Sequence, residues 1–333
     1  MKSASKIASI LIIGIVCILP GSCKKEEIPE NYLEEKDYTY INQLFVSDGK
    51  LWVLSSIPNR WISILPVLPR SQVSVTDLET GKYSFNNKIP SILTMSEESS
   101  QTPFLATFDR RILKLNDDLS YEDFFRIPVS CIVNEILCRN ENDLFIATYS
   151  AGIYFFNGTD TVNFTSSTSL LETNHIPFIT ADNESNVLLM QSNRLFRIDM
   201  NRVMTRESDT LPLKRNQAAA GHISADKDNT LWVSKWDGNT DRIYKKTINS
   251  CWTEVQPPAS SSGRNIRFIR SDSRGTIWIV YGKHPKDLLA YYDSDIWNVV
   301  DIPVDEIVIL DVDTYKDEII TGTSEGIYKI PMP

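Results

Sequence analysis

The chain has 333 residues, of which 42% are hydrophobic and 23% are charged; these fractions are typical of a folded globular protein and exclude a disordered or collagen-like chain. Its length allows two ordinary domains or one large all-β domain. Acidic residues number 43 against 34 basic ones, which gives a net charge of -9 without a local basic patch, so no nucleic-acid partner is expected.

The first residues read as a secretory signal peptide over residues 1–22. An apolar run of 13 residues, Ile7–Leu19, follows a basic start and is shorter than the ~20 residues that span a bilayer. A short membrane anchor is the alternative interpretation. The next residues, Leu19-Pro20-Gly21-Ser22-Cys23, resemble a bacterial lipobox, in which small residues precede a cysteine. This resemblance implies cleavage before Cys23 and acylation of Cys23, so that a lipid anchor holds the chain at a membrane.

The residues after the lipobox, Lys24, Lys25, Glu26 and Glu27, place acidic side chains directly behind lysine. This order resembles the surface-export signal of lipoproteins in one Gram-negative phylum. It implies an anchor in the cell outer membrane with the domain displayed on the cell surface. An anchor that faces the periplasm is one alternative, and a merely solvated tether is another. Residues 23–38 are therefore expected to form the lipidated tether.

Three cysteines follow the lipidated one: Cys131, Cys138 and Cys251. The cell envelope permits disulfides, but an odd number leaves at least one thiol unpaired. Cys131 and Cys138 lie in and beside an apolar stretch, and we expect them to be buried structural thiols. No Cys and His residues have the spacing of zinc ligands. No cofactor is predicted.

The rest of the chain, residues 39–333, repeats a short apolar strand, a polar turn and a strand that bears an aromatic residue. Successive copies of one equivalent position lie 41 to 52 residues apart. These residues are Trp52, Phe104, Phe145, Leu188, Trp232, Trp278 and Ile320. A second set precedes most of them by 7 to 10 residues: Phe45, Ile136, Ile179, Ile223, Ile269 and Leu310. An aromatic final segment often ends each unit near a proline.

Four short strands in about 40 to 45 residues are typical of one blade of a β-propeller. A single blade cannot bury both of its faces, so blades must stack radially against one another. Seven units fit the chain, with six or eight as alternatives, and the expected fold is all-β. The last unit ends at Pro333 after three strands. We expect residues 32–40 to supply its outer strand, because that pairing would close the ring and hide two open edges.

Two stretches carry a family resemblance, ADKDNTLWVSKW at Ala225–Trp236 and SDSRGTIWIVYG at Ser271–Gly282. They resemble the two-component-regulator propeller repeat. Two further stretches, SAGIYFF and SEGIYKI, match the later half of that repeat. The double glycine of that repeat is reduced to Gly152 and Gly326, and the first two units match poorly. In this family, propellers often form the extracytoplasmic sensors of histidine kinases and bind glycan fragments. The resemblance implies a free-standing relative of those sensors, since this sequence contains no kinase motif.

The insertion in the first repeat, Ser56–Ser71, is the leading candidate for a ligand-binding surface. It is apolar and rich in proline, with Arg60, Trp61 and Arg70 near its edges, and Arg and Trp are favoured at interfaces. The alternative is a long hairpin packed on the propeller. His222 begins a predicted inner strand and is the second candidate, either facing the mouth of the central channel or serving as a structural histidine.

Aspartates beside predicted turns are expected to act structurally. Asp226 and Asp272 precede the turns of the two clearest repeats and are predicted to cap those turns through their side-chain oxygens. Residues 237–241 (DGNTD) resemble the start of a calcium loop, but the distant bidentate glutamate is missing. A metal site there, or at Asp311, Asp313 and Asp317, is the minor alternative.

Three functions are compatible with this sequence, and fold alone does not choose among them. The first is a surface lipoprotein that binds a glycan or an envelope protein without catalysis, and abundant aromatics with no catalytic motif favour it. The second is a propeller-type polysaccharide lyase or glycosidase, which requires carboxylates or histidines to converge at the channel mouth. The third is a scaffold for assembly in the envelope.

The lipobox interpretation predicts the behaviour of a single variant. Cys23→Ala should lose acyl labelling and leave the membrane fraction, because the anchor is attached to this residue. Metabolic labelling with a fatty-acid analogue and membrane fractionation measure both effects. Replacing Lys25, Glu26 and Glu27 by Ala should keep the lipid but remove protease accessibility on intact cells. Labelling that persists in Cys23→Ala would exclude the lipobox.

Overall fold

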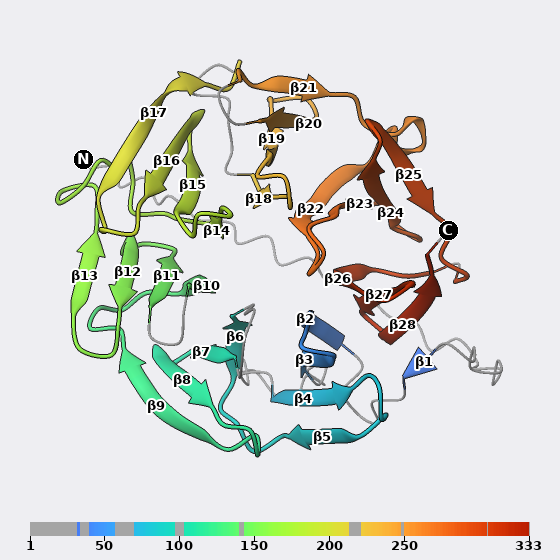
Figure 1. Cartoon of the computed structure of the whole chain (residues 1–333), viewed down its shortest axis with the longest axis horizontal. Helices are drawn as coiled ribbons and strands as arrows, with labels where there is room; N and C mark the ends of the chain where they lie inside the picture. The colour runs from blue at the N-terminus through green and yellow to red at the C-terminus, as the bar shows by residue number, and fades with distance from the viewer. Residues whose placement is uncertain are drawn as a thin grey trace, which may run out of the picture. The chain divides into compact units, whose positions relative to one another are not determined.

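The computed structural model describes residues 32–33, 40–56, 70–96, 103–139, 143–212, 221–247, 250–304 and 306–332. These residues form seven four-stranded antiparallel sheets arranged as blades around a ring (Figure 1). The prediction of an all-β, seven-bladed propeller is confirmed, and the alternatives of six and eight blades are wrong. The described part of the chain has one short 3-10 turn, η1 (Ala259–Ser261), and no helix long and apolar enough to cross a bilayer.

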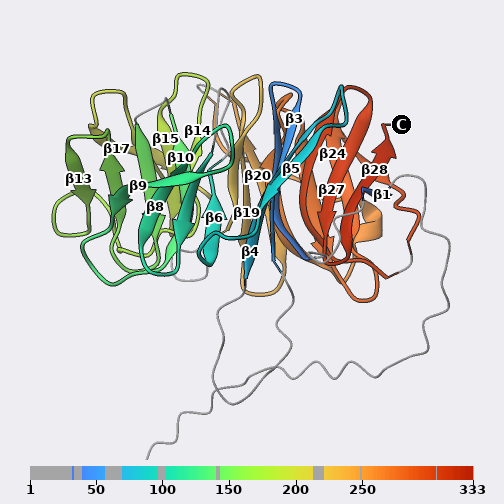
Figure 2. The same ribbon diagram turned by 90° about the horizontal axis from the view of Figure 1, so that it is seen from below.

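The blades follow one another in chain order, and each runs from an inner strand at the centre to an outer strand at the rim (Figures 1 and 2). Blade 1 has β2 (Tyr40–Ser47), β3 (Lys50–Ser56), β4 (Ser71–Asp77) and β5 (Tyr83–Asn86), and blade 2 has β6 (Ile92–Met95), β7 (Phe104–Thr107), β8 (Arg111–Leu115) and β9 (Tyr121–Arg126). Blade 3 has β10 (Val133–Cys138), β11 (Leu144–Thr148), β12 (Ile153–Phe156) and β13 (Thr161–Phe164), and blade 4 has β14 (Thr180–Ala181), β15 (Val187–Gln191), β16 (Arg194–Ile198) and β17 (Met204–Thr210). Blade 5 has β18 (Ile223–Ala225), β19 (Leu231–Trp236), β20 (Asp241–Lys246) and β21 (Thr253–Val255), and blade 6 has β22 (Asn265–Ser271), β23 (Ile277–Gly282), β24 (Leu288–Asp293) and β25 (Ile296–Val300). Blade 7 has β26 (Ile309–Tyr315), β27 (Glu318–Thr323), β28 (Gly326–Pro331) and, as its outer strand, β1 (Tyr32–Leu33).

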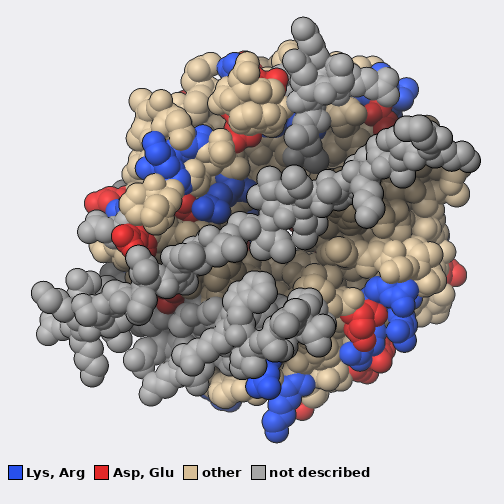
Figure 3. All heavy atoms as spheres, turned by 180° about the vertical axis from the view of Figure 1, so that it is seen from behind, with Lys and Arg blue, Asp and Glu red and all other residues tan. Residues whose placement is uncertain are grey.

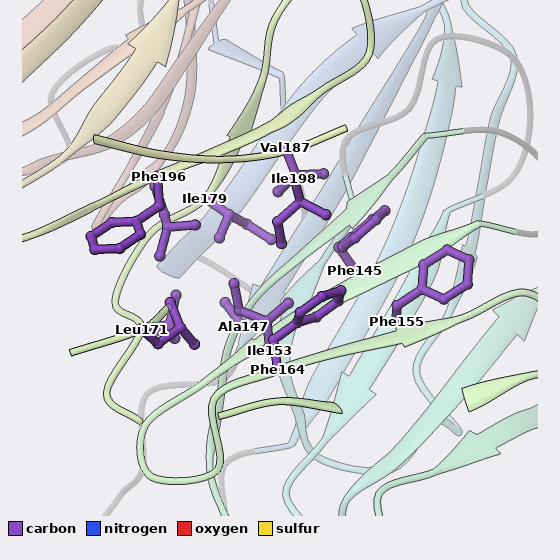
Figure 4. Close-up of a cluster of buried hydrophobic side chains, with 12 residues drawn as sticks. Phe145, Ala147, Ile153, Phe155, Phe164, Leu171, Ile179, Val187, Phe196 and Ile198 are labelled. Carbon is purple, nitrogen blue, oxygen red and sulfur yellow. The ribbon is translucent and has the colours of Figure 1, made fainter. Parts of the chain in front are cut away.

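The core is divided into seven apolar clusters, one at each junction between neighbouring blades. Figure 4 shows the cluster between blades 3 and 4, where Phe145 and Phe155 meet Val187 and Phe196. Because a blade is covered on both faces, its second strand reads as a continuous apolar run instead of an alternating one. β11 (LFIAT) and β15 (VLLMQ) are buried at every position.

The first repeat position predicted from the sequence is confirmed. All seven residues, from Trp52 to Ile320, lie in second strands and are buried. Each one packs into the cluster that its blade shares with the following blade. The repeat therefore preserves the direction in which this side chain points, whether the residue is Trp, Phe, Leu or Ile.

The residues predicted for the second repeat position are wrong in blades 1 and 7. Ile136, Ile179, Ile223 and Ile269 pack against the preceding blade, whereas Phe45 packs against the following one. Leu44 and Val312 occupy the equivalent places in blades 1 and 7. The register of β26 shifts between Ile309 and Asp311, so Leu310 is the extra residue of a β-bulge. A bulge breaks the alternation of faces, and counting residues cannot follow it.

The junction between blades 7 and 1 combines a small apolar cluster with buried carboxylates. Its cluster has seven buried residues, whereas the one between blades 3 and 4 has twelve. Asp311 Oδ2 accepts the backbone N–H of Leu44 at 2.7 Å, and Asp313 Oδ2 accepts that of Val46 at 2.5 Å. At the rim, β1 pairs with β28 through Tyr32 with Tyr328 and Leu33 with Ile327.

Lys235 in β19 is a buried cation without a counter-charge. Lys235 is 1% exposed, and its Nζ atom has no hydrogen-bond partner among the described residues. Burial lowers the pKa of Lys235 to about 8. A buried ammonium without a partner destabilises the folded state, because it has lost its hydration without receiving bonds in return.

Lys235→Met is therefore predicted to stabilise the protein. The pKa falls from 10.5 to about 8, which corresponds to a cost of about 3 kcal/mol at pH 7. The cost is complete below pH 8 and vanishes as the pH rises towards 10.5, since the unfolded amine then also becomes neutral. Urea unfolding at both pH values measures the gain, which should shrink at the higher pH. A variant that is less stable than the natural protein at pH 7 would contradict this account.

Candidate functional site

A cavity of about 550 Å³ lies where the inner strands converge. Parts of β2, β10, β14, β18, β22 and β26 line it, together with residues just before β14 and β18. We define the entry face as the face that holds the first residues of the inner strands, such as Tyr40, Val133 and Asn265. β3 returns to this face, since Ser56 pairs with Tyr40. Figure 3 views this side, where the visible charged side chains form separate groups with uncharged surface between them.

β-Bulges shape the wall of the cavity. Five inner strands carry one extra residue each: Asn42, Leu93, Asn134, Arg267 and Leu310. A bulge leaves the extra residue unpaired and redirects its side chain. Asn42, Arg267 and Leu310 line the cavity. The bulges thus bring one amide, one cation and one apolar side chain to its wall.

Arg267 is held in place by two neighbours. A Cβ atom at Gly282 would lie only 2.8 Å from Arg267 Nε, so the guanidinium lies over a position that must lack a side chain. Arg267 Nε donates to Asp287 Oδ2 at 2.7 Å, and the Asp287 carboxylate is 1% exposed. Asp287 also accepts the backbone N–H of Ile309 at 2.9 Å, which links blade 6 to blade 7. Charge and geometry therefore fix this side chain in advance of any ligand.

Three side chains, each directly after a bulge residue, accept a backbone N–H group of the following blade. Gln43 Oε1 accepts the N–H of Met95 at 2.9 Å, Glu135 Oε2 accepts that of Ile179 at 2.6 Å, and Asp311 Oδ2 accepts that of Leu44. Asp311 also forms an ion pair with Arg270, which lines the cavity. Burial raises the pKa of Asp311, and Arg270 opposes that rise. These polar side chains satisfy N–H groups of inner strand edges.

His222 lies in the cavity wall and stacks on Phe178, with ring centroids 3.9 Å apart. Burial lowers the pKa of His222 to about 4, and a hydrogen bond to the backbone of Arg267 partly opposes the shift. The imidazole is therefore neutral at pH 7. Phe178 and Phe268, which also line the cavity, occupy the equivalent positions of blades 4 and 6. Aromatic rings thus form one side of the wall.

The residues named from the sequence have different outcomes. His222 is at the cavity, as its candidate role requires. Arg60 and Trp61 lie outside the described residues, and so do Cys23, Lys24, Lys25, Glu26 and Glu27, so their predicted roles stay predictions. Arg70 is exposed, directly before β4 at the entry face, but does not line the cavity.

Sequence reasoning missed most of the cavity wall, including Glu135, Arg267 and Arg270. The residues of the wall form no motif in the chain, because six separate strands contribute them. Asp311 was noticed only as a minor metal candidate. A possible signal was the aspartate or glutamate that recurs near the start of inner strands, but a bulge precedes it in each case and shifts its register.

The aspartates near turns act as predicted. Asp272 Oδ1 accepts the N–H groups of Arg274 and Thr276, at 2.9 and 2.8 Å, and Asp226 Oδ1 does the same for Asp228 and Thr230. In residues 237–241, Asp237 caps the turn before β20 and forms an ion pair with Arg242. Among the described residues, no group of three or more His, Cys, Asp or Glu side chains could hold a metal ion.

The three cysteines of the domain lie within the described residues and differ in exposure. Cys138 is buried, Cys131 is half-buried and Cys251 is exposed. Burial raises the pKa of the Cys131 thiol, which favours its unreactive form.

No family model and no curated protein matches the chain. Solved structures with the same fold include a catalytically inactive variant of virginiamycin B lyase from Staphylococcus aureus with quinupristin (16% identity over 91% of this chain and 98% of that chain, TM-score 0.66). They also include the extracellular domain of BT4673 from B. thetaiotaomicron, assigned to a hybrid two-component system (13% identity, 90% of this chain and 39% of that chain, TM-score 0.63). A third is YCF48 from Cyanidioschyzon merolae (11% identity, 91% and 98%, TM-score 0.62). At these identities the likeness establishes the fold.

His222→Phe should remove a pH dependence of stability. The folded pKa of about 4 lies below the unfolded value of 6.5, so the unfolded chain takes up this proton first as the pH falls. The stability that the neutral ring contributes is therefore fully present above pH 6.5, and it is lost as the pH falls from 6.5 to about 4. Phenylalanine, the residue of the neighbouring blades at this position, does not titrate. Thermal unfolding of both proteins across this pH range tests the idea, which fails if the two profiles remain parallel.

Proposed function

We propose that the protein is a surface-anchored lipoprotein that binds a neutral glycan in the central cavity without acting on it. The single observation that carries the proposal is the cavity itself, whose volume of about 550 Å³ is in the range of ligand sites. Its wall combines Phe178, Phe268 and Leu137 with amide, hydroxyl and guanidinium groups. A sugar ring offers an apolar face to the first kind of group and hydroxyls to the second.

The charges of the cavity favour a neutral ligand. Asp287 already neutralises Arg267, and Asp311 neutralises Arg270. Both carboxylates are almost completely buried, so these pairs exist before any ligand arrives. Among the described residues of the wall, an anionic ligand would find no uncompensated cation, and it would also meet Glu135. A hydroxyl group needs no counter-charge and can use the remaining guanidinium N–H groups.

The ionisable groups of the wall support binding over catalysis. Glu135 and Asp311 are engaged as acceptors of backbone N–H groups, and His222 has a pKa of about 4. General acid–base catalysis works best with a group whose pKa lies near the working pH and whose proton can reach the substrate. Groups already used to join blades are poorly suited to that task.

Surface display is supported by the lipobox at Cys23 and by the order of Lys24, Lys25, Glu26 and Glu27. The resemblance to two-component-regulator propellers, stated on the residues around Trp232 and Trp278, supports an extracytoplasmic glycan ligand. BT4673, whose extracellular domain has this fold, is consistent with such a location. A lipid anchor would then hold a binding domain where polysaccharides reach the cell.

Affinity electrophoresis of the full chain in detergent against laminarin, mannan, xylan and starch tests the proposal. At least one of them should retain the protein. Leu310→Arg should abolish retention by filling the cavity, and the fold should tolerate it because Arg267 occupies the same bulge position in blade 6.

Val203→Arg is the matched control. Val203 is 53% exposed and lies in the turn between β16 and β17, on the face opposite to the entry face. This variant should bind like the natural protein. No retention by any polysaccharide, or retention unchanged in Leu310→Arg, would overturn the proposal. Shortened or unsaturated products in the same samples would make the protein a glycosidase or a lyase.

A further inference from the structure

Blade 3 presents a group of exposed side chains at the entry face. Tyr149 is 57% exposed and Ile132 is 54% exposed. The Tyr149 ring lies 4.7 Å from the ring of the exposed His175, at an interplanar angle of 53°. We call Ile132, Tyr149 and His175 the ledge. Single exposed apolar residues are ordinary on a protein surface, but adjacent ones indicate an interaction site.

The backbone beneath the ledge is firmly held. Tyr149 N–H donates to Ile132 O at 2.9 Å, which joins the first two members of the ledge. Ile176 N–H donates to Thr148 O, and Gly152 N–H to Asn174 O, each at 2.9 Å, so the segment that carries His175 is tied to the turn that carries Tyr149. The rings are therefore presented with little loss of backbone freedom on binding, which favours recognition.

Gly152 closes this turn. Its φ of +77° lies in the left-handed region, and a Cβ atom there would lie 2.0 Å from Phe164 O. Only glycine fits both conditions. The turn between β11 and β12 thus has a single geometry, which places Tyr149 at the entry face.

The ledge continues directly into the cavity along one strand. Ile132 immediately precedes β10, and Val133 pairs with Thr148, the residue before Tyr149. Further along β10, Glu135, Ile136 and Leu137 line the cavity. A chain molecule that extends from the cavity along β10 towards the entry face therefore reaches the ledge.

We propose that the ledge is a second subsite of the glycan site, at which a sugar unit of the same chain, outside the cavity, stacks on Tyr149. This inference rests on the proposed function and extends it: the ligand is a neutral polysaccharide chain, longer than the part that the cavity holds. The apolar face of a sugar ring lies against the phenol ring and Ile132, while His175 offers a hydrogen-bonding edge.

The experiment compares short and long oligosaccharides made from whichever of laminarin, mannan, xylan or starch retains the full chain. Isothermal titration calorimetry measures both affinities. Long oligosaccharides should bind more tightly to the natural protein. Tyr149→Ala should lower the affinity for long ones about tenfold, the equivalent of one good aromatic contact, and leave short ones unchanged. Tyr149→Phe should keep the preference for length.

Phe85→Ala is the matched control, because Phe85 is 52% exposed on the outer strand β5, at the rim of blade 1. It should not change either affinity. Equal affinities for short and long oligosaccharides, or a preference for length that survives Tyr149→Ala, would overturn the ledge while leaving the cavity site intact. Loss of all binding in Leu310→Arg, together with a loss of affinity only for long oligosaccharides in Tyr149→Ala, supports both the cavity site and the ledge. Absence of binding to every polysaccharide overturns the proposed function and the ledge with it.

Discussion

Every blade of this protein is buried on both faces only because the ring closes between blade 7 and blade 1. A four-stranded sheet has two faces and cannot cover either by itself, so an open row of blades would leave two apolar faces in water. The closing junction has the smallest apolar cluster, with seven buried residues, and adds bonds from Asp311 and Asp313 to the backbone of β2. Buried hydrogen bonds to charged groups are directional, so they specify which strands meet in a way that apolar packing alone does not.

The central cavity follows from the same constraint. Closing the ring brings inner strands together whose edges have no strand partner, and their N–H groups need acceptors. Side chains such as Gln43, Glu135 and Asp311 supply them across the junctions, next to bulges that redirect Asn42, Arg267 and Leu310. The features that satisfy the inner edges thus also decide the chemistry of the cavity wall, where guanidinium groups arrive already neutralised.

The repeat is recognisable because part of its chemistry is local. Asp226 Oδ2 accepts Trp232 Nε1 at 3.0 Å, and Asp272 Oδ2 accepts Trp278 Nε1 at 2.9 Å, while the other oxygen of each aspartate caps the turn. In blade 4, Leu188 replaces the tryptophan, and Arg197 binds the Asp182 oxygen at 2.8 Å instead. A divergent copy therefore keeps its aspartate and its turn although the indole is gone, which explains why only two copies are clear in the sequence.

The sequence by itself determined the strands, the number of blades and the direction of the residues from Trp52 to Ile320, because strand alternation and turn capping act over a few neighbouring residues. It misplaced Leu310, which is the extra residue of a bulge, and Phe45, which pairs directly with Trp52 and so points to the same face as that residue. It pointed to His222 but not to Arg267, Glu135 or Tyr149 as parts of one surface. Those residues meet only when blades distant in the sequence close into a ring. The pairing of each arginine of the cavity wall with a carboxylate is likewise a tertiary property, because it depends on which aspartate lies beside which arginine after closure.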